Sequence, residues 1–310
     1  MTMNPVSLSA DPLDQSWYEA SARGRIDALV DPGTFEEFIG PEQRVMSPHL
    51  PAFELPRAFD DGIVVGRGLL DGATILIAAQ EGRFMGGAFG EIHGAKLVGL
   101  LRAALAVKPV AVLILFDTGG VRLQEANAGE TAIAEIMRAI VALRMAGVPV
   151  IGLIGGRAGC YGGGGLIAGT CSRLVVSEVG RISVSGPEVI ETNKGAEEFD
   201  SRDRALVWRT MGGKHRRLIG GADAFADDTI RAFRDAALGQ IGKAPAFDLA
   251  TLEAEQARLE ARLDRFGDAR DATEIWGRLG VNDPATVPGL NRHAFDALLA
   301  RLPEAPHDAR

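Results

Sequence analysis

The sequence contains few of the residues that provide reactive side chains or metal ligands. Among its 310 residues there are two cysteines, Cys160 and Cys171, and no Cys-x-x-Cys pair, which argues against a disulfide framework and a zinc ribbon. The five histidines are scattered along the chain, so a histidine-based metal site has no support. A GxxxxGKS/T phosphate loop and a GxSxG nucleophile elbow are both absent. We therefore expect no metal and no nucleophile of these kinds.

Positive charge and long apolar runs are also scarce. The formal net charge is −8 and the isoelectric point about 5.3, whereas a protein that binds nucleic acid is usually basic. The longest apolar tract, 98–116, is interrupted by Arg102, Lys108 and Pro109, so it does not predict a membrane span. Residues 1–15 lack the basic and apolar regions of a signal peptide. Together with the low cysteine content, this predicts a cytoplasmic protein.

Glycine is abundant, with 39 residues, and it is densest at 155–171, which reads GGRAGCYGGGGLIAGTC. The apolar run 148–154 before it predicts a buried strand, and 166–168 after it predicts the start of a helix. Such a loop presents backbone N–H groups at the positive end of a helix dipole, and glycine lets a ligand approach them. Such a loop is typical of a site that binds an anion or an oxygen that becomes negative during a reaction. The alternative is a tight turn that only lets a helix pack closely on a strand.

The same pattern occurs one unit earlier in the chain. The apolar run 110–116 predicts a buried parallel strand, 117–122 reads DTGGVR, and 130–145 has apolar residues on one helical face. N–H groups from the two loops could point at one oxygen and form an oxyanion hole for a thioester enolate. A loose dinucleotide fingerprint, Gly163-x-Gly165-x-x-Ala168, is the weaker interpretation, because its glycines come too late after the strand.

The other segments predict an α/β domain with a helical end. Asp71-Gly72 between two apolar runs predicts a β-hairpin over 62–80. Further helices are predicted at 12–30, 34–38, 93–106, 224–241, 251–266 and 291–302, and strands at 173–177 and 181–184. This alternation predicts right-handed βαβ crossovers on a sheet. We divide the chain into a lead-in with a helix and an irregular loop (1–61), a core (62–243) and a helical C-terminal extension (244–310).

Four motifs, in this order, carry a resemblance to a known family. They are Phe84–Gly87, Asp117–Glu125, Tyr161–Gly163 and Ser185–Glu191. Over about residues 20–235 the chain resembles the carboxyltransferase β subunits of acyl-CoA carboxylases. The resemblance implies a crotonase-like (ClpP/crotonase) α/β fold of repeated ββα units. The zinc ribbon of the bacterial acetyl-CoA carboxylase β subunit is missing here.

Residues 203–216 are more similar to the β subunit of biotin-independent malonate decarboxylase. That resemblance implies an enzyme subunit that decarboxylates a malonyl thioester to an acetyl thioester and CO2. The thioester would be carried by the CoA-like phosphopantetheine group of an acyl-carrier subunit, or by CoA, with no cofactor bound covalently to this chain. A homologous γ subunit would complete the enzyme. The alternatives are a biotin-dependent carboxyltransferase β subunit and a non-catalytic, crotonase-like scaffold subunit.

The same resemblance implies where the oxyanion hole lies. Its donors would be the backbone N–H groups of Gly120 or Val121 in the first loop and of Gly163 or Gly164 in the second. One such donor is typically worth about 3–4 kcal/mol of transition-state stabilisation.

Other residues are assigned to substrate binding. Gly119, Gly162 and Tyr161 are predicted to line the site, and Tyr161 either protonates the enolate or packs beside the loop, with water or the γ subunit as other proton sources. The basic run Lys214, Arg216 and Arg217 is either a solvated helix end or a contact to the phosphates of the CoA-like arm, and we assign it to the phosphates.

Overall fold

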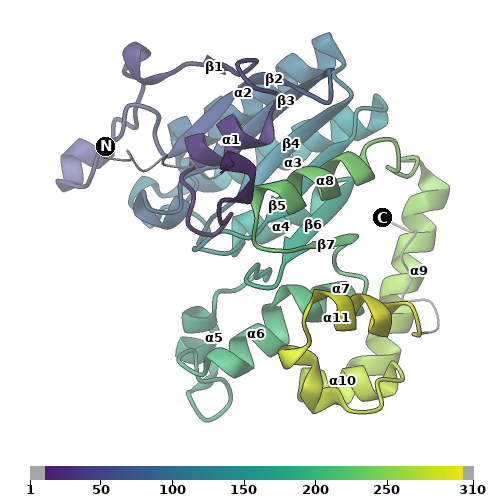
Figure 1. The fold of residues 1–310 in the computed structure, drawn as a ribbon. Coiled ribbons are helices and arrows are strands. Elements are labelled where there is room, and N and C mark those ends of the chain that lie inside the picture. Colours follow the sequence, from purple (N-terminus) through teal and green to yellow (C-terminus); the bar gives the residue numbers. More distant parts are fainter. Residues whose placement is uncertain (1–10, 303–310) are drawn as a thin grey trace, which may run out of the picture.

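A seven-stranded sheet organises residues 11–302, the part of the chain that the computed structural model describes (Figure 1). The strands are Glu36–Phe38 (β1), Ile63–Leu70 (β2), Ala73–Gln80 (β3), Ala111–Phe116 (β4), Val150–Ile154 (β5), Arg173–Ser177 (β6) and Ala224–Ala226 (β7). They lie in chain order, with β1 to β3 antiparallel and β3 to β7 parallel. The order lacks the reversal of a dinucleotide-binding sheet, so that interpretation is wrong. Residues 1–10, part of the segment used to predict that no signal peptide is present, lie outside the described residues.

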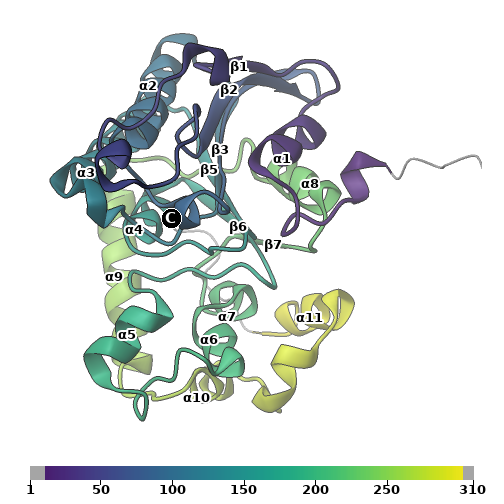
Figure 2. The ribbon, with the colours of Figure 1, turned by 90° about the vertical axis from the view of Figure 1, so that its left-hand side faces the viewer.

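Helices cover both faces of the sheet, which explains why the central strands are unbroken apolar runs. In β4, Val112, Ile114 and Phe116 pack on one face, and Leu113 and Leu115 pack on the other. Helices α2, α3 and α4 cover the first face, and α1 and α8 cover the second (Figure 2). The helices are Ala22–Leu29 (α1), Glu91–Val107 (α2), Asn127–Met145 (α3), Gly163–Thr170 (α4), Pro187–Lys194 (α5), Arg204–Met211 (α6), Gly213–Leu218 (α7), Ile230–Gln240 (α8), Leu249–Phe266 (α9), Ala272–Arg278 (α10) and Arg292–Leu299 (α11).

Most elements near the two glycine loops agree with the sequence patterns. The hairpin over 62–80 is confirmed, with φ of 53° at Asp71 and 75° at Gly72, as a two-residue hairpin turn of the type I′ kind requires. The predicted strands at 110–116 and 148–154 are confirmed as β4 and β5. Helix α4 begins at Gly163, inside the glycine run and three residues before its predicted start.

The predicted N-terminal helix over 12–30 is wrong in its first half. The structure has a short 3-10 turn at Pro12–Asp14 and then α1, which starts only at residue 22. Between them, the Asp228 carboxylate accepts hydrogen bonds from Ser16 Oγ at 2.6 Å and from Tyr18 N–H at 2.8 Å. These bonds hold the connecting segment beside the start of α8, so it cannot continue as a helix.

Two more predicted helices are corrected at the sheet. Residues 34–38 were predicted as a helix but contain β1, whose Glu36 pairs with Arg67 at the edge of β2. The predicted helix over 224–241 begins with β7, which pairs with β6, and becomes helical only after the Thr229 cap. In both cases a free strand edge provides backbone partners that the local sequence does not show.

Single backbone bridges form a second tier beyond the carboxyl ends of the parallel strands. They are Phe89–Val121, Thr118–Cys160 and Cys160–Ile182. Each of β4 and β5 is thus followed by a bridged segment and then by a helix, which is the repeated ββα unit with its second strand reduced to a bridge. The predicted strand at 181–184 is wrong. In this segment only residues 181 and 182 form single bridges, and α5 starts at residue 187.

Helices α5 to α7, α10 and α11 gather on one side of the layered part, and α9 runs beside them (Figures 1 and 2). Trp276 Nε1 donates to Nδ1 of the buried His215 at 3.1 Å, and burial lowers the pKa of His215 to about 3, so the ring is a neutral acceptor. The long α9 has no buried side chain. No helix within residues 11–302 combines the length and apolar character needed to cross a membrane. The division at 61 and 243 stays a prediction.

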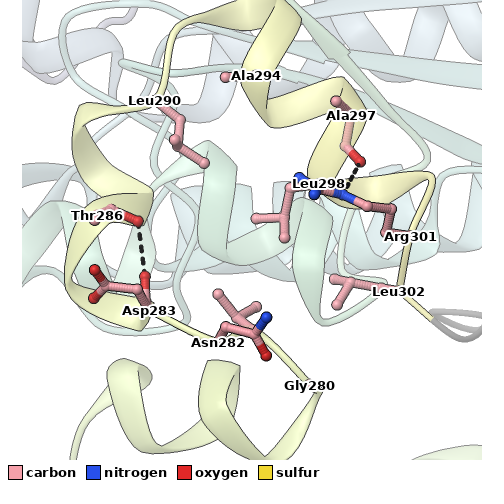
Figure 3. Close-up of a pocket in the computed structure, with 11 residues that line it drawn as sticks. Gly280, Asn282, Asp283, Thr286, Leu290, Ala294, Ala297, Leu298, Arg301 and Leu302 are labelled. Carbon is pink, nitrogen blue, oxygen red and sulfur yellow. Dashed lines mark hydrogen bonds between the residues drawn. The ribbon is translucent and has the colours of Figure 1, made fainter.

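A cavity of about 590 Å³ lies between residues 280–286 and α11 (Figure 3). Two of its polar side chains bond to nearby backbone: Thr286 Oγ1 donates to the Asp283 carbonyl at 2.8 Å, and Arg301 Nε donates to the Ala297 carbonyl at 3.0 Å. No residue of either glycine loop lines this cavity, so it is separate from the candidate site.

Candidate active site

The two glycine loops lie against each other at the carboxyl ends of β4 and β5. Thr118 N–H donates to the Gly159 carbonyl at 2.8 Å, and Tyr161 N–H donates to the Thr118 carbonyl at 3.0 Å. Gly120 and Gly162 also lie close together, since a Cβ on Gly162 would lie 3.1 Å from Gly120 Cα. Their φ angles of 129° and 56° also favour glycine. The structure therefore brings together the two loops that the sequence pattern paired.

Two of the four candidate donors are used inside the loops. Gly120 N–H donates to the Thr118 hydroxyl at 3.1 Å, and Gly164 N–H donates to the carbonyl three residues earlier at 3.0 Å. The N–H groups of Val121 and Gly163 have no hydrogen-bond partner among residues 11–302. These two residues are neighbours, because a Cβ on Gly163 would lie 3.1 Å from Val121 Cγ2. Each loop therefore has one candidate N–H without a partner in the described part of the chain.

The consecutive glycines also have a packing role. A Cβ on Gly163 would lie 2.6 Å from Cγ1 and Cδ1 of Ile133 on α3, and one on Gly164 would overlap the Thr118 methyl group. The first turn of α4 therefore needs glycine to approach α3 and the first loop. The close-packing alternative applies here, and a side chain at either position would disturb this packing.

A buried ion pair lies where the first loop begins. Arg25 Nη1 is 2.9 Å from Asp117 Oδ2, and the two side chains are only 1% and 4% exposed. Asp117 Oδ1 also accepts from Ala158 N–H at 2.7 Å, while Asp117 N–H donates to Gln80 Oε1 at 3.1 Å. Asp117 therefore connects α1, β3 and the second loop to the end of β4. Sequence reasoning gave it no role, although an acidic residue directly after a buried strand was an available signal.

The predicted substrate-lining residues differ in their surroundings. Gly119 borders open space, because a Cβ there would meet only the Gly86 carbonyl oxygen, at 3.5 Å, in the described structure. Tyr161 is 6% exposed and packs against Val207 and Met211 of α6. Burial raises the pKa of Tyr161. The structure thus supports the packing alternative for Tyr161.

The basic run is tied to the protein itself. Lys214 Nζ donates to Glu178 Oε1 at 2.9 Å and to the carbonyls of Pro288 and Leu290 at 2.8 and 2.7 Å. An ammonium group has three protons, so all of its donors are used. In this structure Lys214 therefore has no proton left to donate to a phosphate, and we do not assign phosphate binding to it.

The two arginines of the run lie on α7. Arg217 is half-buried with the Asp223 and Asp296 carboxylates near it, and burial lowers its pKa. Arg216 is also half-buried, and its carbonyl accepts hydrogen bonds from the N–H groups of Gly221 and Ala222. Phosphate binding by Arg216 and Arg217 stays a prediction.

We expect Lys214→Met to lower the free energy of unfolding by about 2 kcal/mol or more, because the Glu178 carboxylate and two backbone carbonyls lose the charged donor of a buried lysine. The KM for a malonyl thioester should not change, whereas Arg216→Gln combined with Arg217→Gln should raise it at low salt. Denaturant unfolding measures the stability and steady-state kinetics measure the KM. Lys194→Met, at the exposed end of α5, is the control. A raised KM with unchanged stability in Lys214→Met would instead make Lys214 a phosphate contact.

Comparison with known proteins shows the family to which the chain belongs. Residues 19–215 match the carboxyl transferase domain family. The chain is 40% identical to malonyl-S-ACP:biotin-protein carboxyltransferase MADC of Malonomonas rubra, over 93% of this chain and 97% of that protein. It is also 40% identical to a chain of the Pseudomonas malonate decarboxylase hetero-tetramer solved with malonate, with a TM-score of 0.76 over 90% of this chain and 98% of that one. The chain is 26% identical to a transcarboxylase 12S chain, with a TM-score of 0.62, and the match covers 73% of this chain and 41% of that one.

The chain belongs to the carboxyl transferase domain family, and the predicted crotonase-like α/β fold is confirmed. Within that family, the resemblance to malonate decarboxylase subunits is also confirmed.

Proposed function

We propose that this chain is the β subunit of a malonate decarboxylase and that its two glycine loops stabilise the enolate of a malonyl thioester. The observation that carries the proposal is that two residues in contact, Val121 and Gly163, one from each loop, have backbone N–H groups without partners among the described residues. The Gly163 N–H also lies at the N-terminus of α4, where the helix dipole favours negative charge.

In the proposed reaction, the bond between the malonyl carboxylate carbon and C2 breaks and CO2 leaves. The electron pair of that bond moves onto the thioester as an enolate, whose oxygen accepts hydrogen bonds from the two N–H groups. A proton then adds to C2 and gives the acetyl thioester. Because Tyr161 is packed against α6, we assign this proton to water or to the partner subunit.

Partners are part of the proposal. The related Pseudomonas structures are a hetero-tetramer and a hetero-dimer. Exposed apolar side chains flank both loops here, with Leu123 at 87%, Val184 at 62% and Leu166 at 45% exposure. We propose that a homologous γ subunit covers this surface, and that an acyl-carrier subunit delivers the malonyl thioester on a CoA-like phosphopantetheine arm.

A second candidate follows from the relative in Malonomonas rubra, whose name specifies carboxyl transfer from malonyl-S-ACP to a biotin protein. In that reaction the same enolate forms, but the carboxyl group is passed to biotin instead of leaving as free CO2. The two loops would serve both reactions, so only the acceptor separates the two candidates.

We expect the complex of this chain with its γ subunit to release CO2 from malonyl-carrier protein without biotin, and the chain alone to be nearly inactive. CO2 release is measured with and without a biotinylated acceptor protein. A strict requirement for the acceptor would favour the second candidate. No turnover under either condition would favour a non-catalytic scaffold subunit.

A further inference from the structure

A buried hydrogen-bond network joins the two ends of the first glycine loop. Asp117 N–H donates to Gln80 Oε1 at 3.1 Å, and Gln80 Nε2 lies 3.2 Å from His93 Nε2. On the other side of the imidazole ring, His93 Nδ1 lies 3.3 Å from the Asp61 carbonyl, which also accepts from Arg122 Nη2 at 2.8 Å. The side chains of Gln80, His93, Asp61 and Arg122 are buried.

Fixed backbone groups set the direction of each bond in this network. A backbone N–H only donates, so Gln80 must turn its oxygen toward Asp117 and its amide nitrogen toward His93. His93 Nε2 then accepts, and the ring proton lies on Nδ1, from which it is donated to the Asp61 carbonyl. Burial lowers the pKa of His93 well below its usual range, so the ring is neutral. Only one arrangement of protons therefore satisfies the network.

The far end of the loop is held just as firmly. Arg122 Nη1 binds Asp61 Oδ2 at 2.6 Å and Glu125 Oε1 at 3.2 Å, while Arg122 N–H donates to the Phe89 carbonyl at 2.9 Å. Val121, whose N–H has no partner in the described part of the chain, directly precedes this anchor. Gln80 bonds directly to Asp117, and His93 connects it through the Asp61 carbonyl to Arg122. Loss of Gln80 or His93 therefore weakens the support of segment 117–122 at both of its ends.

We propose that Gln80 and His93 are positioning residues that align the Val121 N–H by holding segment 117–122. Neither side chain needs to touch the substrate for this role. The effect on the reaction rests on the proposed function, whereas the effect on the loop does not. Because a displacement of about 1 Å can cost roughly a hundredfold in rate, the loss should appear in kcat.

The main test is Gln80→Met, which keeps the side-chain length and removes both the oxygen and the nitrogen of the amide group. In the complex with the partner subunit, kcat should fall about ten- to a hundredfold, with KM changed less than about threefold. Backbone hydrogen exchange in segment 117–122 should become faster. His93→Gln, which can still accept from Gln80, should keep more kcat than His93→Leu.

The matched control is Ser172→Ala, at the amino-terminal ends of β5 and β6, away from the glycine loops. The buried Ser172 Oγ accepts from Val150 N–H at 3.1 Å, so this variant also removes a buried acceptor of a backbone N–H. It should lower stability and leave kcat per folded molecule unchanged.

The outcomes separate this inference from the proposed function. Unchanged exchange at 117–122 in Gln80→Met overturns the positioning role, whatever the reaction. Faster exchange with unchanged kcat in an active complex also overturns it. If the unmodified complex does not decarboxylate, the proposed function fails, and hydrogen exchange alone decides the positioning role. Equal kcat values for His93→Gln and His93→Leu would show that His93 has no positioning role.

Discussion

Replacing Gly163 by proline should lower kcat for decarboxylation about a hundred- to a thousandfold relative to replacing it by alanine, in a common Ile133→Ala background. Both replacements add a Cβ, but only proline removes the backbone N–H that we assign to the oxyanion hole. Loss of one such donor typically costs 10²–10³ in kcat, or about 3–4 kcal/mol.

The background mutation makes the comparison possible. A Cβ on Gly163 would lie 2.6 Å from Cγ1 and Cδ1 of Ile133, and Ile133→Ala removes both atoms. Position 163 is the first residue of α4, where proline is well tolerated, and the preceding Gly162 has no Cβ to clash with the proline ring. Both variants carry the same packing loss at Ile133, so their difference reports the N–H group.

The measurement is kcat at saturating malonyl-carrier protein, after assembly with the partner subunit and the melting temperature have been checked for both variants. Equal kcat for the proline and alanine variants would mean that the Gly163 N–H takes no part in the reaction. The glycine run would then serve only the close packing of α4, and the active site would have to lie elsewhere.

The largest expected effect on stability belongs to the ion pair between Arg25 and Asp117, which are 1% and 4% exposed. Arg25→Met should lower the free energy of unfolding by about 3–5 kcal/mol, because the Asp117 carboxylate is left buried without its cation. Arg67→Met is the matched control, since its partner Glu36 and Arg67 itself are more than half exposed, and it should cost less than about 1 kcal/mol.

A double-mutant cycle identifies the cause of this loss. Asp117→Asn retains an oxygen for the Ala158 N–H and removes the negative charge, so combining it with Arg25→Met leaves no unpaired charge in the interior. The double variant should therefore be more stable than Arg25→Met alone, as measured by denaturant unfolding. A double variant as unstable as the sum of the single variants would show that packing, not the charge pair, accounts for the loss.

Local sequence patterns predicted much of the fold around the candidate site. A short apolar run is typical of a strand that is covered on both faces, which is why residues 110–116 and 148–154 predict β4 and β5. Asp71-Gly72 identified the hairpin for an equally local reason, since few residues adopt the required positive φ. The errors arose where distant partners decide the conformation, as at 34–38, which pairs with the edge of β2.

The sequence alone thus determined where the two glycine loops lie and that each joins a buried strand to a helix, because strand and helix periodicity and the conformational freedom of glycine are local properties. Tertiary structure decided which N–H groups in the loops have partners. Among residues 11–302, it left those of Val121 and Gly163 without partners and used those of Gly120 and Gly164 inside the loops, because the acceptors depend on how the loops fold. It also turned Lys214 toward two carbonyls of the segment between α10 and α11, more than 70 residues away in the chain. Hydrogen bonding of this kind depends on which distant groups meet when the chain packs, and no local pattern contains that information.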